Sequence, residues 1–153
     1  MQILNKLFFL SILLALNFVS CQSKMVVDST SYKNLDSEKK QDVDEYLTDA
    51  KKMIPKKETE IILMFQYNCF FQKKITINNR YTKEFPKTDK IHYGQSIVNF
   101  SKKLGKIKIK LSNGKYFTIL QKKGYDYITI CYNEQYETLY IHYYDFPKIL
   151  IEE

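Results

Sequence analysis

Few side chains in this sequence could do covalent or metal chemistry. The chain has only two histidines, His92 and His142, and three cysteines. Structural zinc sites use cysteine and histidine in closely spaced pairs, and the two histidines do not have such a spacing with Cys69 and Cys131. The sequence contains no HExxH, glycine-rich phosphate loop, CxxC or EF-hand pattern. We therefore expect no metal, no cofactor and no enzymatic activity, unless the fold brings His142 to a carboxylate in a cleft.

The many tyrosines of the chain favour a ligand-binding surface over a catalytic site. The chain has 13 Tyr and 10 Phe but no Trp, and Tyr supplies rigid, amphipathic contact surface at low entropic cost. Two predicted strands, 125–132 and 136–144, carry polar and aromatic residues of one parity on one face. The candidate ligand-binding residues on this face are Tyr125, Tyr127, Tyr140, His142 and Tyr144. The alternative is a structural role, in which these tyrosines lie beneath a covering helix.

The first twenty residues predict an export signal. After Lys6, an apolar run of thirteen residues extends from Leu7 to Val19. A membrane-spanning helix needs about 20 such residues, whereas a signal peptide needs about 7–15 followed by small residues. We therefore interpret residues 1–20 as a signal peptide.

The residues that end this run, Phe18-Val19-Ser20-Cys21, resemble the lipobox of bacterial lipoproteins. Val19, Ser20 and Cys21 match the usual types, and Phe18 replaces the more common Leu. The resemblance implies that Cys21 carries acyl chains such as palmitate and becomes the first residue of the mature protein. Because Gln22 and not Asp follows, it also implies the outer membrane, on either side. The alternative is an ordinary cleaved signal with a coincidental cysteine.

If Cys21 carries lipid, Cys69 and Cys131 remain. An oxidising, exported location permits a disulfide between them. Two buried thiols in separate strands are the alternative, because free cysteine is among the most buried residue types.

Residues 21–35 are polar and are expected to form a flexible tether after the lipidated cysteine. In residues 36–55, apolar side chains recur at helical spacing, which predicts an amphipathic helix over about Ser37 to Met53. Asp36 or Ser37 can cap its start, and Pro55 stops it. We expect this helix to dock on the domain's own sheet, although a partner-binding helix would have the same pattern.

Residues 58–153 carry strand patterns separated by turn signals at intervals of about ten residues. The continuous apolar run from Ile61 to Tyr67 predicts a central strand buried on both faces. Alternation over Lys106–Leu111, followed by Asn113-Gly114, predicts a hairpin. A three-residue loop would place Ile109 beside Phe117 and give a consistent apolar face.

The last two strands have a second apolar face that we expect to be core. With a two-residue loop at Glu134-Gln135, the apolar residues of the two strands would lie side by side. These are Ile128, Ile130 and Tyr132 on the first strand and Leu139, Ile141 and Tyr143 on the second. The pattern predicts a mainly β fold, an antiparallel sandwich or open barrel of about seven or eight strands, with one N-terminal α-helix.

The net charge of +7 comes from the β-domain, where residues 61–153 hold 15 Lys/Arg against 8 Asp/Glu. Lys106, Lys108 and Lys110 form a basic stripe that could attract acidic groups or be a solvated face. Export excludes nucleic acid as a natural partner.

In composition and strand layout the whole chain resembles short uncharacterised lipoproteins of Bacteroidota-type bacteria. The expected function is an outer-membrane-anchored lipoprotein that acts as a binding or interaction module in the cell envelope. Its expected partners are the membrane, through lipid on Cys21, and an envelope protein or glycan. The alternative is an envelope inhibitor or immunity protein that blocks a toxin or hydrolase.

Overall fold

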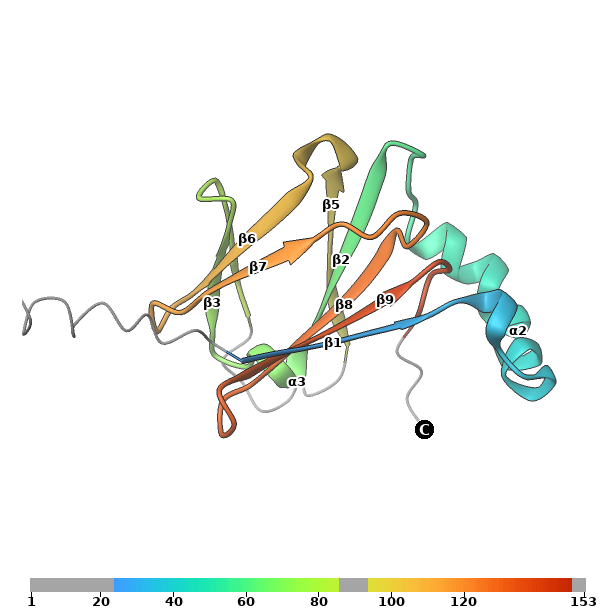
Figure 1. Cartoon of the computed structure of the whole chain (residues 1–153), viewed down its shortest axis with the longest axis horizontal. Coiled ribbons are helices and arrows are strands. Elements are labelled where there is room, and N and C mark those ends of the chain that lie inside the picture. Colours follow the sequence, from blue (N-terminus) through green and yellow to red (C-terminus); the bar gives the residue numbers. More distant parts are fainter. Residues whose placement is uncertain (1–23, 86–93, 150–153) are drawn as a thin grey trace, which may run out of the picture.

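A computed structural model describes residues 24–85 and 94–149, which form two open β-sheets packed face to face (Figure 1). The larger sheet has the strand order β1-β9-β8-β2-β5, with bounds Lys24–Thr30, Thr138–Tyr144, Tyr127–Asn133, Glu60–Gln66 and Gln95–Ser101. The smaller sheet has the order β4-β3-β6-β7, with bounds Tyr81–Glu84, Lys74–Ile77, Lys106–Leu111 and Tyr116–Leu120. The mainly β prediction is confirmed, and the architecture is a sandwich of nine described strands.

Helices lie between and beside the strands. The long helix α2 covers Ser37–Met53, and α3 is a single turn at Tyr67–Phe70. Two short 3-10 helices, η1 at Tyr32–Asn34 and η2 at Lys102–Leu104, complete the described elements.

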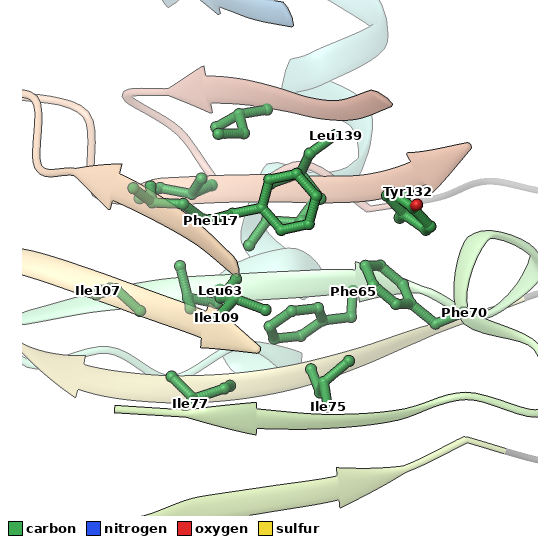
Figure 2. Close-up of a cluster of buried hydrophobic side chains, with 14 of the residues drawn as sticks. Leu63, Phe65, Phe70, Ile75, Ile77, Ile107, Ile109, Phe117, Tyr132 and Leu139 are labelled. Atoms are coloured by element: carbon green, nitrogen blue, oxygen red, sulfur yellow. The ribbon is translucent and has the colours of Figure 1, made fainter. Parts of the chain in front are cut away.

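The core lies between the two sheets, and β2 supplies its centre. Every residue from Ile61 to Phe65 is buried, because one face of β2 packs in the core between the sheets and the other packs against Ile54 and Tyr127. Leu63 and Phe65 point toward the smaller sheet and meet Ile75 of β3 among others (Figure 2). Burying one such side chain stabilises the fold by about 1.5–3 kcal/mol. The interpretation of this segment as a two-sided central strand is therefore correct.

Both predicted hairpins form, with one difference in loop length. Ile109 pairs with Phe117 across a three-residue turn that uses Gly114 at φ 86°, as the apolar face requires. In the β8–β9 hairpin the predicted core face is also correct, and Ile130 pairs with Ile141. The loop has four residues, Glu134–Glu137, and not two, because the Asn133 side chain accepts a hydrogen bond from the Tyr136 N–H at 3.0 Å.

Helix α2 has the bounds that periodicity and capping predict. The Asp36 carboxylate accepts a hydrogen bond from the Lys39 N–H at 2.9 Å and caps the first turn. Val43 and Ala50 are buried, and Ile54 directly after the helix joins an apolar cluster on the outer face of the larger sheet. The helix therefore docks on its own domain.

The expectation of a flexible tether over residues 21–35 is wrong for the part that the structure describes. Lys24–Thr30 forms strand β1 at the edge of the larger sheet, parallel to β9. Strand β9 lies more than one hundred residues away in the sequence, so no local pattern predicts that β1 pairs with it. The sheet is also mixed and not purely antiparallel, since β2 and β8 pair in parallel as well. Cys21 and His92 lie outside the described residues.

Candidate functional site

The predicted tyrosine face is partly closed by packing. Tyr127 is buried with Ile54, Ile62 and Met64 on the outer face of the larger sheet. Tyr125 precedes the start of β8 and packs against the main core instead, with Lys122 Nζ 4.3 Å from the centre of its ring. These two tyrosines therefore have structural roles.

The other three predicted residues, Tyr140, His142 and Tyr144, come together on β9. They line a cleft of about 310 Å³ on the outer face of the larger sheet. Neighbouring strands complete its lining with Val26, Asp28, Gln66, Thr129, Cys131 and Ile141. The register explains this grouping, because Asp28 of β1 and Thr129 of β8 both lie directly beside His142. Residues on paired positions of adjacent strands point to the same face.

Asp28 is the site residue that sequence reasoning missed. It lies in the segment interpreted as a tether, and only the parallel pairing of β1 with β9 brings it to the cleft. The alternation of Val26, Asp28 and Thr30 was the one signal for a strand in this segment. It is short and lies among polar residues, so it did not predict a strand.

His142 contacts three neighbouring side chains on this face. Its Nε2 shares a hydrogen bond of 2.7 Å with Thr30 Oγ1, and its ring stacks on Tyr144 with ring centres 4.3 Å apart. Its Nδ1 lies 3.7 Å from Asp28 Oδ2. Burial lowers the pKa of the imidazole, and the Asp28 carboxylate opposes this only in part. The imidazole is therefore neutral near pH 7.

The cleft combines an aromatic wall with several hydrogen-bonding groups. Tyr140 is 40% exposed and lines the cleft. A carboxylate, an amide and a hydroxyl lie around it, from Asp28, Gln66 and Thr129. Binding sites for small ligands typically have such a volume and such a mixture of apolar surface and few polar groups.

A disulfide fixes the edge of the cleft. Cys69 in α3 is bonded to Cys131 in β8, so the second of the two alternatives, separate thiols, does not apply. Cys131 itself lines the cleft. The bond ties α3, and with it the end of β2 that carries Gln66, to the strand that forms the cleft floor.

The hydroxyl, imidazole and carboxylate of Thr30, His142 and Asp28 lie in the order used by hydrolytic triads. The distance of 3.7 Å from His142 to Asp28 exceeds a hydrogen bond. The Asp28 side chain is also 74% exposed. The carboxylate therefore does not hold the imidazole in one orientation, and the geometry suits ligand binding better than nucleophilic catalysis.

The basic stripe lies away from the cleft. Lys106, Lys108 and Lys110 alternate with buried isoleucines on β6 and point outward from the smaller sheet. Lys110 Nζ lies 5.3 Å from the centre of the Tyr116 ring. The stripe is an exposed face on the other side of the sandwich.

Among residues 24–85 and 94–149, no group of three or more His, Cys, Asp or Glu side chains is arranged to hold a metal ion. Within the same ranges, no helix has the length and apolar character needed to cross a membrane. No protein-family model, curated protein or solved structure matches the chain.

Proposed function

We propose that this protein is a lipoprotein anchored to the outer membrane by Cys21, and that its larger sheet binds a glycan of the cell envelope. The observation that carries the proposal is the cleft in which Tyr140, His142 and Asp28 meet. An aromatic ring packs against the apolar face of a sugar, while the carboxylate and the amide of Gln66 accept and donate hydrogen bonds at its rim.

The disulfide supports an exported location. Structural disulfides persist in oxidising compartments and are rare in the cytosol. A bond between Cys69 and Cys131 therefore agrees with the signal peptide that residues 1–20 predict, and with the resemblance of Phe18–Cys21 to a lipobox.

Retention on purified peptidoglycan sacculi tests the ligand. The mature chain is compared with Tyr140→Ala and with Tyr81→Ala, a control on the smaller sheet whose residue is 39% exposed, against 40% for Tyr140. We expect Tyr140→Ala to lose retention and Tyr81→Ala to keep it. Equal retention of all three proteins would exclude the cleft as the glycan site.

A second experiment separates binding of a glycan from binding of a protein. Co-purification from envelope extract, with and without excess soluble peptidoglycan fragments, identifies what occupies the cleft. A single toxin or hydrolase that depends on Tyr140 and ignores the fragments would favour the inhibitor or immunity function.

The arrangement of Thr30 and His142 makes a hydrolase the third candidate function. An activated hydroxyl reacts covalently with a fluorophosphonate probe. Labelling that is lost in Thr30→Val and in His142→Gln would establish this function, and an unlabelled wild-type protein would remove it.

A further inference from the structure

Three chain connections meet at one end of the sandwich. The β6–β7 turn contacts the β8–β9 turn through an ion pair between Lys115 Nζ and Glu137 Oε2, 2.5 Å apart. The link between α3 and β3 reaches the same turn through Lys73 Nζ and Glu134 Oε2, 2.6 Å apart. Helix α2 lies at the other end (Figure 1). We call this group of connections the turn end.

Strand β1 begins at the turn end. Its first residue, Lys24, pairs with Thr138, which directly follows the β8–β9 turn. Lys24 is only three residues after Cys21, and three residues span at most about 11 Å when fully extended. A lipid on Cys21 therefore holds the turn end close to the bilayer and leaves no room for a long tether.

The side chains at the turn end suit a membrane surface. Tyr136 of the β8–β9 turn is 63% exposed and Tyr116 beside the β6–β7 turn is 59% exposed. Tyrosines prefer the interface between lipid headgroups and water, because one edge of the ring is apolar and the hydroxyl is polar. Tyr136 on its turn and Tyr116 at the start of β7 can enter this interface together.

The charges at the turn end also permit contact with anionic lipid. Glu134 and Glu137 are each paired with a lysine, which offsets their repulsion from a negative surface. Lys24 is exposed at the start of β1, and each lysine near such a surface contributes about 1 kcal/mol of attraction.

We propose that the turn end rests on the bilayer that holds the lipid of Cys21, with Tyr116 and Tyr136 in the headgroup region. This inference depends on the proposed lipid anchor and adds the orientation of the domain. Asp28 lies four residues along β1 from Lys24, a rise of about 13 Å. The cleft would then open sideways close to the membrane, where it reaches only ligands near the bilayer.

Fluorescence quenching by nitroxide-labelled lipid tests this orientation in the full lipidated protein, reconstituted in vesicles that contain anionic lipid. An environment-sensitive fluorophore is attached at Tyr136→Cys. The control is Leu104→Cys in η2 at the opposite end, where the native side chain is 46% exposed. Because Cys69 and Cys131 are bonded, only the introduced thiol reacts. We expect at least threefold stronger quenching at position 136 than at position 104.

Equal quenching at the two positions, or stronger quenching at position 104, would overturn the orientation and leave the anchor intact. Mass spectrometry of the same sample reports the acyl chains on Cys21. An unacylated protein that stays in solution would overturn the anchor as well as the orientation, so the two failures are distinguishable.

Discussion

His142 Nε2 and Thr30 Oγ1 lie 2.7 Å apart although 112 residues separate them in the sequence. This contact exists because β1, the first described strand, pairs in parallel with β9, the last. It joins the two strands on the face where the cleft opens, and it makes the stability of this edge depend on the protonation of one imidazole.

We predict that His142 makes the protein less stable below neutral pH. Burial holds the folded-state pKa of His142 below its unfolded value of about 6.5, so the unfolded chain binds the proton more readily. The stabilising contribution is present above pH ~6.5 and is lost as pH falls toward the folded pKa. Urea titrations from pH 7.5 to pH 5 should show this loss in the wild type and a smaller one in His142→Gln. Identical pH profiles would contradict the prediction.

We predict that Asp126→Asn lowers the free energy of unfolding at pH 7 by about 1–3 kcal/mol. The Asp126 carboxylate accepts from Lys56 and Lys102, each at 2.8 Å. Burial alone would raise its pKa, but the hydrogen bonds from the two lysines outweigh this and lower it. The stabilisation is therefore present above the unfolded pKa and is lost as pH falls through the folded value.

Chemical denaturation at pH 7 and at pH 2.5 checks the Asp126 prediction. The control is Asp49→Asn, whose exposed carboxylate pairs with Lys52 on α2 and should contribute less than about 0.5 kcal/mol. A difference between wild type and Asp126→Asn that persists unchanged at the lower pH would show that the effect is not electrostatic.

We predict that removal of the disulfide destabilises the domain by about 2–4 kcal/mol. Cys69 and Cys131 are 62 residues apart, so the bond restricts a long loop in the unfolded chain. A double variant with alanine at both positions should have the same denaturation midpoint as wild type under a strong reductant. A wild type whose midpoint does not respond to reductant would refute this expectation.

We predict that alanine substitutions at two tyrosines of the same face lower the stability by different amounts. Tyr127→Ala should cost about 3 kcal/mol of stability, because its ring is buried with Ile62 and Met64. Tyr140→Ala should cost less than about 1 kcal/mol, because that ring borders the open cleft. Thermal melts of the two variants measure the difference. Similar melting temperatures would contradict the prediction, because Tyr140 would then stabilise the fold as much as Tyr127.

Local patterns in the sequence are sufficient for the parts of the fold that local physics determines. Helix α2 has a side-chain cap and one apolar stripe, and the β6–β7 hairpin has strict alternation around Asn113-Gly114. Each of these signals lies within the element that it specifies. The core faces of β8 and β9 follow from the period of two in the same way.

The remaining features depend on contacts between distant residues. Near Met25 the alternation is too short and too polar to predict a strand, and its partner Leu139 lies at the other end of the chain. The same pairing brings Asp28 into the cleft. The sequence left open whether the tyrosines would be covered, and the structural alternative holds for Tyr127, which packs against Ile54 directly after α2. The candidate site was therefore predicted on one strand and missed on its neighbour.

The pairing of the first strand with the last has a consequence for the order of events in the cell. Because β1 has its only described partner in β9, the edge of the larger sheet cannot form until residue 144 has been synthesised. Pairings between such distant segments form late and slowly. Strand β1 therefore stays without its described neighbour until the C-terminal strand β9 is available, and the larger sheet is completed only at the end of folding.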